Sequence, residues 1–107
     1  MDLNTLHVMT EKYEAIAYYF SGADCGVCTV LQPAMEQLFQ ETFPAIQWQE
    51  VALDESPEIA GQLQLFSIPT LLVYFDGKEV LRKSRNFSAG EIKNGIERLY
   101  SLRFDEK

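Results

Sequence analysis

Cys25-Gly26-Val27-Cys28, preceded by the apolar run Ala15-Ile16-Ala17-Tyr18-Tyr19-Phe20, is the stretch that decides the fold. A short continuous apolar run of this kind predicts a buried central strand, and Ser21-Gly22 after it predicts a turn. The residues after Cys28 carry apolar side chains at helical spacing, at Val30, Leu31, Met35, Leu38 and Phe39. We therefore expect Cys25 at the point where a strand leads into a helix N-terminus.

Cys25 and Cys28 are the only cysteines of the chain, and their spacing places both sulfurs on one helical turn. A Cys-x-x-Cys pair within a strand-helix pattern indicates reversible dithiol chemistry rather than a structural disulfide. Unpaired backbone N–H groups at a helix N-terminus, together with the helix dipole, stabilise a thiolate and so lower the pKa of a thiol there. Cys28 lies one turn further along, so we expect its sulfur to be the more covered of the two.

The length and the first residues of the chain bound the class of protein. With 107 residues, 47% of them hydrophobic, the chain fits one domain that spans residues 1–107. The first twenty residues lack a basic start, a long apolar core and a small-residue cleavage site, so we expect no signal peptide. No apolar run approaches the length that spans a membrane. These observations predict a cytoplasmic protein with no membrane partner.

The charge of the chain is acidic and unevenly distributed. The net charge is −7: residues 1–76 hold eleven acidic side chains and only Lys12, a balance of −10, whereas residues 77–107 hold eight basic and five acidic side chains, a balance of +3. An acidic balance argues against nucleic acid as a partner. We interpret the basic C-terminal third as a solvated face rather than a binding patch.

Turn and cap signals divide the rest of the chain into elements. Ser56-Pro57 predicts a helix start with a hydroxyl cap and a proline at the first helical position. Asp76-Gly77 is typical of a tight hairpin, and Ser88-Ala89-Gly90-Glu91 is a capping box. The expected elements are a helix at 2–12, a strand at 15–20, a helix after Cys25, a strand at 46–53, a helix from 57 to about 64, strands at 71–75 and 79–83, and a helix after Ser88.

Four motifs in this order resemble those of the thioredoxin family, over about residues 13–102. Cys25-Gly26-Val27-Cys28 resembles the family's Cys-Gly-Pro-Cys, and Pro33 stands where the family's first long helix carries a proline. Ile68-Pro69-Thr70 resembles its cis-proline loop, and Phe75-Asp76-Gly77-Lys78 its hairpin. The resemblance implies an α/β thioredoxin-like fold, with a central mixed four-stranded sheet flanked by helices and without the N-terminal strand of longer thioredoxins.

The resemblance also implies a thiol-disulfide oxidoreductase that acts on protein disulfides, with Cys25 as the nucleophile and Cys28 as the resolving cysteine. A cis Ile68-Pro69 bond would bring that loop against the cysteines; a trans proline at a strand start is the alternative. The residues expected to contact substrate are Gly26, Val27, Phe66, Ile68, Pro69 and Thr70. The family binds no cofactor, and its disulfide is reduced with electrons from NADPH through thioredoxin reductase, or by a glutathione system. We expect a monomer rather than a dimer.

Asp24 stands where family members carry a tryptophan before the first cysteine. A carboxylate close to Cys25 would oppose thiolate formation and raise the pKa of its thiol. The alternative is that Asp24 caps the helix or faces water. Arg85, near a position where the family usually has glycine, would offset the effect if it pairs with Asp24; otherwise it is a solvated arginine at a strand end.

Tyr19 and Glu50 replace a buried aspartate of the family and the lysine that partners it. The family's aspartate assists proton transfer at the second cysteine, and a tyrosine with a pKa near 10 is a poor base at neutral pH. We hypothesise that Glu50 supplies the proton-transfer carboxylate, with Tyr19 as its hydrogen-bond partner. The alternative is that Glu50 is simply exposed on an edge strand.

Two other readings of the chain stay open. The altered residues around the cysteines suit a thioredoxin-fold interaction module with slow cysteines that binds a protein partner. His7 and the two cysteines give only three metal ligands, so we expect no metal within one chain. A cluster shared between two chains through their Cys-x-x-Cys motifs is the alternative to that expectation.

Overall fold

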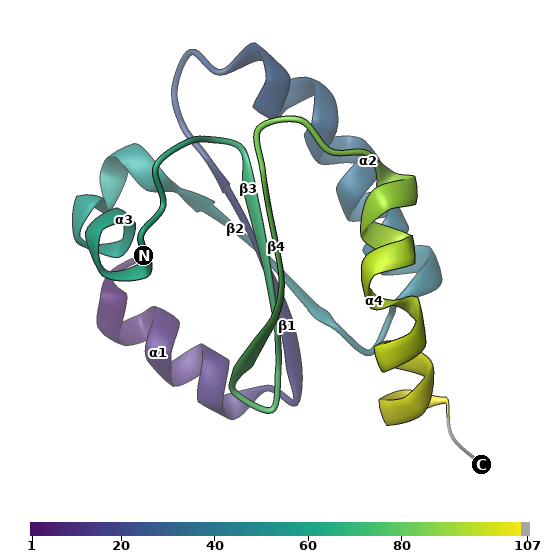
Figure 1. Cartoon of the computed structure of the whole chain (residues 1–107). Helices are drawn as coiled ribbons and strands as arrows, with labels where there is room; N and C mark the ends of the chain where they lie inside the picture. The colour runs from purple at the N-terminus through teal and green to yellow at the C-terminus, as the bar shows by residue number, and fades with distance from the viewer. Residues whose placement is uncertain (106–107) are drawn as a thin grey trace.

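A computed structural model describes residues 1–105 and shows a four-stranded sheet with helices on both faces (Figure 1). The elements, in chain order, are α1 (Leu3–Lys12), β1 (Ala15–Ser21), α2 (Gly26–Thr42), β2 (Gln47–Ala52), the 3-10 turn η1 (Leu53–Glu55), α3 (Pro57–Leu63), β3 (Thr70–Phe75), β4 (Lys78–Ser84) and α4 (Ala89–Phe104). This arrangement confirms the expected fold class and element order. Among residues 1–105, no helix combines the length and the apolar character needed to cross a bilayer.

The sheet has the strand order β2-β1-β3-β4 and is mixed. Strand β1 pairs parallel with β2 and antiparallel with β3, while β3 and β4 form an antiparallel hairpin. The hairpin turns at Asp76 and Gly77, whose φ angles of 53° and 81° are both positive, as expected for an Asp-Gly turn. Because α2 connects the parallel strands β1 and β2, the cysteines at its start lie at the carboxyl end of a central strand.

Two separate cores lie on the two faces of the sheet. Figure 1 shows α2 and α4 on one face and α1 and α3 on the other. Ala15, Ala17 and Tyr19 of β1 face the α2–α4 core, and the alternate residues Ile16, Tyr18 and Phe20 face the α1–α3 core. The continuous apolar run therefore has a simple cause, since both faces of this strand are covered. Burial of each large side chain stabilises the fold by about 1.5–3 kcal/mol.

One local expectation is wrong, and one short element was not foreseen. Ser56 does not cap α3 with its hydroxyl; the side chain is buried and donates to the backbone oxygen of Met1 instead. The hydroxyl has found a partner more than fifty residues away, which local sequence spacing does not reveal. The turn η1 was also not expected. By contrast, Pro57 opens α3 as predicted, and the capping box of α4 forms between Ser88 and Glu91.

Candidate active site

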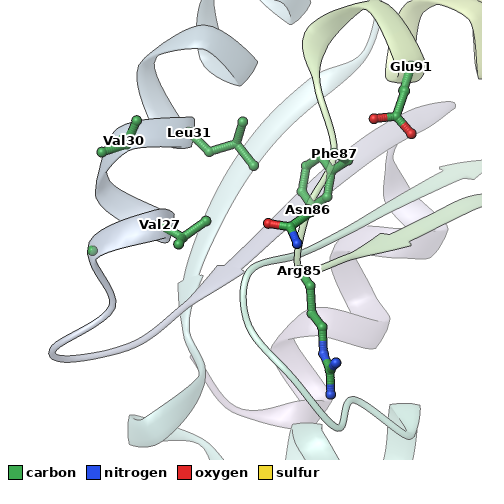
Figure 2. A pocket seen from close by; sticks show the side chains of 8 residues that line it. Val27, Val30, Leu31, Arg85, Asn86, Phe87 and Glu91 are labelled. Atoms are coloured by element: carbon green, nitrogen blue, oxygen red, sulfur yellow. The ribbon is translucent and has the colours of Figure 1, made fainter.

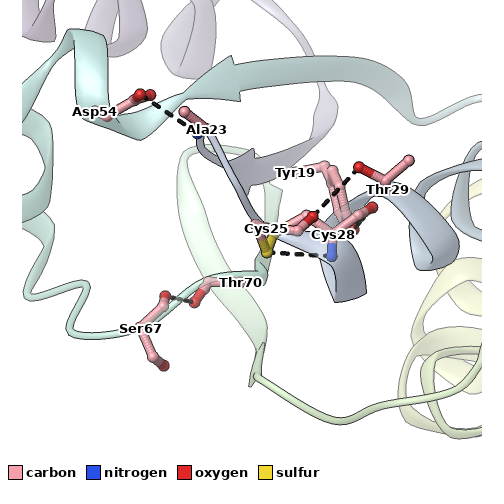
Figure 3. The surroundings of a disulfide bond; sticks show 8 residues. All are labelled: Tyr19, Ala23, Cys25, Cys28, Thr29, Asp54, Ser67 and Thr70. Atoms are coloured by element: carbon pink, nitrogen blue, oxygen red, sulfur yellow. Dashed lines mark hydrogen bonds between the residues drawn. A yellow bond between two sulfur atoms is a disulfide. The ribbon is translucent and has the colours of Figure 1, made fainter.

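Cys25 and Cys28 are joined by a disulfide at the start of α2, with their Cα atoms 5.3 Å apart. Cys25 is the N-cap residue, and its Sγ accepts a hydrogen bond of 3.2 Å from the backbone N–H of Cys28 (Figure 3). Cys25 is partly exposed, whereas Cys28 is buried. The two sulfurs therefore differ in access, and the helix N-terminus directs a donor and the positive end of its dipole toward the accessible one.

The loop before β3 lies against the segment that precedes the cysteines. The Ile68–Pro69 peptide bond is cis, and Pro69 is buried. A Cβ atom on Gly22 would lie 3.0 Å from Cδ1 of Ile68, so the absence of a side chain at Gly22 permits this close approach. Thr70 fixes the loop, since its hydroxyl donates to the backbone oxygen of Ser67 at 2.7 Å.

An apolar groove of about 700 Å³ opens beside the cysteines, between α2 and the start of α4. Val27 and Leu31 of α2 point toward Phe87 across this groove (Figure 2). Val27 is half-exposed, whereas Phe87 is buried and forms part of the wall. Phe66 does not line the groove, although its side chain is 91% exposed. Of the apolar residues expected to contact substrate, Val27 therefore lines the groove opposite Phe87, whereas Phe66 lies outside it.

A polar pocket of about 250 Å³ lies on the other side of α2 and reaches Cys28. Tyr19 and Glu50 also line it. The buried hydroxyl of Tyr19 donates to the backbone oxygen of Cys28 at 2.7 Å. Burial, and to a smaller extent the charge of Glu50, raise the pKa of Tyr19 to about 12. Tyr19 therefore keeps its proton at neutral pH and acts as a donor, not as a base.

The hypothesis that Tyr19 is the hydrogen-bond partner of Glu50 is wrong. These residues are direct neighbours across β1 and β2, but the hydroxyl of Tyr19 reaches the first turn of α2. Glu50 instead accepts two hydrogen bonds at Oε2, from Gln32 Nε2 at 2.6 Å and from Trp48 Nε1 at 3.1 Å. Glu50 is exposed on the edge strand β2, which was the alternative to a hydrogen bond with Tyr19. Glu50 also lines the pocket that contains Cys28.

Gln32 and Trp48 are site residues that sequence analysis missed. Gln32 also donates to Oε1 of Glu36 at 2.6 Å, so one amide group links two carboxylates. A signal for Gln32 was available, because it follows Cys28 by four residues and therefore lies on the same helix face. Trp48 precedes Glu50 by two residues on one strand and so shares its face of the sheet.

Comparison with known proteins agrees with this geometry. The family model for thioredoxin matches residues 5–98. The chain belongs to the thioredoxin family. Its membership and the Cys25–Cys28 disulfide support a thiol-disulfide oxidoreductase.

Relatives and solved structures extend the match to this family. The thioredoxin-like protein YdfQ of Bacillus subtilis is 31% identical over 84 residues, which are 78% of this chain and 74% of YdfQ. The thioredoxin of the same organism is 40% identical over 67 residues, 63% of this chain and 64% of that protein. Mitochondrial thioredoxin 3 from Saccharomyces cerevisiae, in its oxidised form, superposes with a TM-score of 0.81 at 23% identity, covering 91% of this chain and 90% of that one. Because the two sequences are only 23% identical, this superposition shows that the fold is shared and nothing further.

Asp24 and Arg85 depart from the thioredoxin pattern, and the sequence left open whether they pair with each other. Among residues 1–105, Arg85 makes no ion pair with Asp24. Both residues have a left-handed backbone, with φ angles of 57° for Asp24 and 70° for Arg85. The backbone N–H of Arg85 donates to the oxygen of Pro69 at 2.8 Å, which ties it to the other loop of the site. Asp24 is exposed and does not cap α2, because Cys25 is the capping residue.

A metal site does not form from the three candidate ligands. His7 lies on α1, which covers the face of the sheet opposite to α2 and its cysteines. Within the part of the chain that the structure describes, no three His, Cys, Asp or Glu residues are grouped in a way that would hold a metal ion.

Proposed function

We propose that this protein is a cytoplasmic thiol-disulfide oxidoreductase that exchanges disulfides with protein substrates through Cys25 and Cys28. The observation that carries the proposal is the asymmetry of the pair. One sulfur is accessible at a helix N-terminus beside an apolar groove, and the other is buried one turn away. Such an arrangement separates an attacking sulfur from a resolving sulfur.

The reaction proceeds in two thiol exchanges. In the reduced protein, the thiolate of Cys25 attacks one sulfur of a substrate disulfide, a Cys25–substrate disulfide forms, and the first substrate thiolate leaves. The thiolate of Cys28 then attacks Sγ of Cys25, the Cys25–Cys28 disulfide forms, and the second substrate thiolate leaves. Two electrons pass from the protein to the substrate, and the protein ends in the disulfide state seen in the structure.

The surface around Cys25 suits an extended substrate segment. Gly26 and Val27 begin one wall of the apolar groove, and Ile68, Pro69 and Thr70 form the loop on the other side of the cysteines. The backbone of Ile68 is the proposed partner of the substrate main chain. Phe66, highly exposed in the same loop, offers a further apolar contact outside the groove. Exposed apolar side chains near a reactive sulfur favour protein substrates over small polar disulfides.

Glu50 is the proposed proton acceptor for Cys28. The thiol of Cys28 must lose its proton before it attacks Cys25, and Tyr19 cannot accept it because its pKa is raised to about 12. Glu50 and Cys28 line the same polar pocket, and Gln32 and Trp48 hold one carboxylate oxygen of Glu50 in place. A water molecule in such a pocket would carry the proton between them.

The protein needs a second redox partner to turn over, because each cycle leaves it oxidised. We propose that thioredoxin reductase, with electrons from NADPH, or a glutathione system reduces the Cys25–Cys28 disulfide. The electrons are carried by the disulfide itself, without a bound cofactor. We further propose that residues 1–107 act as one domain and as a monomer, and that neither nucleic acid nor a membrane is a partner.

Reduction of the interchain disulfides of insulin by excess dithiol tests the proposal. We expect the protein to accelerate this reaction and Cys25→Ser to abolish the acceleration. Cys28→Ser, reduced beforehand and separated from the dithiol, should accumulate a mixed disulfide with the substrate. Equal rates with and without the protein would refute the activity. Equilibration with glutathione buffers measures the reduction potential of the pair and so the direction of electron transfer. A potential below about −260 mV would make the protein a reductant in the cytosol, where the glutathione potential is roughly −220 to −260 mV.

A partner-binding module is the second candidate, and the exposed Asp24 beside Cys25 favours it, since a neighbouring carboxylate opposes the thiolate. A protein partner that binds the Cys25→Ser and Cys28→Ser variants as tightly as the unaltered protein would support the module. Loss of that binding in the Cys25→Ser variant would support the oxidoreductase.

A further inference from the structure

Arg85 holds a backbone conformation that suits glycine better than arginine. It follows β4 and has a φ of 70°, in the left-handed region where a Cβ atom is disfavoured. Strained backbone positions of this kind are concentrated at ligand-binding sites. A glycine would satisfy the fold here with less strain, so the presence of a long cationic side chain requires another reason.

The backbone of Arg85 is fixed beside the reactive centre. Its N–H donates to the oxygen of Pro69 at 2.8 Å, and its side chain lines the apolar groove that begins at Gly26 and Val27. In Figure 2 the side chain extends away from Leu31 and Phe87, so the guanidinium group lies at the end of the groove and not over its apolar wall. A substrate segment that crosses the groove would pass this group.

The guanidinium of Arg85 is available for an external acid. Arg82 pairs with Glu79 at 3.0 Å and Arg103 pairs with Asp76 at 3.1 Å, but within residues 1–105 no carboxylate lies at ion-pair distance from Arg85. A planar guanidinium presents a fork of donors that matches the two oxygens of a carboxylate. Among the side chains of a protein substrate, a carboxylate is the group that would pair with this guanidinium.

We propose that Arg85 selects substrates, namely protein segments with apolar residues next to the reactive cysteine and an acidic residue that reaches the guanidinium. The proposal rests on the proposed oxidoreductase function and names the substrate class of the same groove.

The negative charges around the groove restrict where an acidic substrate residue can bind. Glu91 lines the groove as well, with Oε1 accepting a hydrogen bond of 3.1 Å from the backbone of Ser88, and Asp24 is exposed next to Cys25. Both carboxylates repel an acidic residue, as does the balance of −10 over residues 1–76. An acidic substrate residue is thus favoured only where Arg85 can reach it, so attraction and repulsion together fix the register of the segment.

A set of symmetric peptide disulfides tests the proposal. Each peptide carries apolar residues around its cysteine and either Glu or Gln at one of three positions on each side. With the reduced protein, we expect Glu to raise the second-order rate constant over Gln by about fivefold at one or two adjacent positions, the size of a partly exposed charge pair. We expect added salt to reduce this preference.

Three variants make the test specific. Arg85→Gln removes the charge, and Arg85→Gly removes the side chain at a backbone position that accepts glycine; both should lose the preference for Glu. Arg98→Gln, on the exposed side of α4, changes the net charge equally and should keep it. A preference that survives in both Arg85 variants, or equal rates for all peptides with the unaltered protein, would overturn the proposal. If the unaltered protein reduces neither these peptides nor bis(2-hydroxyethyl) disulfide, the oxidoreductase function itself fails, and this proposal with it.

Discussion

Tyr19 places beneath Cys28 a hydroxyl that stays neutral, at the position where the family resemblance implies a carboxyl group. Its hydrogen bond of 2.7 Å ends at the backbone oxygen of Cys28 and not at the sulfur, so it supports the first turn of α2 without taking part in proton transfer. Any base for the Cys28 thiol must therefore come from another element. Glu50, on the edge strand β2, lines the same pocket and is held there by Gln32 and Trp48.

Glu50→Gln should slow the resolution of the mixed disulfide at pH 7 by about tenfold or more, because the Cys28 thiol loses its proton acceptor. Single-turnover release of the second substrate thiol, followed across pH, measures this step. Glu36→Gln is the matched control: Glu36 also accepts a hydrogen bond from Gln32, at 2.6 Å, but it does not line the pocket of Cys28. An unchanged pH profile in Glu50→Gln would refute the role of Glu50.

Asp24→Asn should lower the pKa of the Cys25 thiol in the reduced protein, because it removes the negative charge of the residue next to the thiolate. Asparagine tolerates the left-handed backbone that Asp24 adopts, so the loop should be preserved. The pH dependence of alkylation of Cys25, measured in the Cys28→Ser background, gives this pKa. Glu58→Gln, an equal change of charge on the exposed side of α3, should leave it unaltered. The same shift in both variants would mean that net charge, and not proximity, sets the reactivity.

At the scale of elements, the sequence predicts best where a pattern is local. The apolar run of β1, the Asp76-Gly77 turn and the capping box at Ser88 each specify their own conformation within a few residues, and each forms as expected. Pro33 lies within α2, where it removes the amide that would donate to the oxygen of Thr29. Ser56 fails as a predicted cap because its partner is the distant Met1. The errors therefore fall where a tertiary contact competes with a local one.

Two glycines in different elements should respond oppositely to alanine. Gly61 lies within α3, and among the described residues a Cβ there would meet no atom within 4 Å, so Gly61→Ala should raise the free energy of unfolding by about 0.5–1 kcal/mol. Gly77 has a φ of 81°, so Gly77→Ala should lower it by about 1 kcal/mol or more. Urea denaturation of both variants measures the change. A shift of the same sign in both would contradict the conformational explanation.

At the scale of the whole molecule, sequence motifs predict the reactive pair but not its surroundings. The cysteines and Pro69 are found by short patterns, and the family resemblance supplies the mixed four-stranded sheet. The contacts of Glu50 depend on the side of β1 on which β2 lies and on how α2 crosses back over the sheet. Spacing along the chain does not encode that geometry. The bond from Gln32 to Glu50, and the lack of an ion pair for Arg85 among residues 1–105, therefore become visible only in three dimensions.

Buried tyrosines in the two cores make the free energy of unfolding of the whole molecule depend on pH in the alkaline range. Tyr19 lies in the α2–α4 core and Tyr18 in the α1–α3 core, with Tyr74 packed against the latter. Burial raises the pKa of all three phenols above the ordinary value of 10, for Tyr19 to about 12. Between pH 10 and pH 12 the unfolded chain loses protons that the folded chain retains. The stabilising effect is therefore complete below pH 10 and is lost as the pH rises.

Tyr19→Phe should make this loss less steep, by about 1 kcal/mol per pH unit between pH 10 and pH 12, since one of the three phenols no longer titrates. Urea denaturation from pH 8 to the alkaline limit of reversible folding measures the slope. At pH 8 the variant should be less stable by about 1 kcal/mol because the hydrogen bond to the oxygen of Cys28 is lost, and this difference is the control for the pH-independent part. The two stability curves should therefore approach each other above pH 10 and cross at about pH 11, above which the variant is the more stable protein. Parallel curves would show that Tyr19 ionises equally in the folded and unfolded chains, and that its burial beneath Cys28 does not hold its proton.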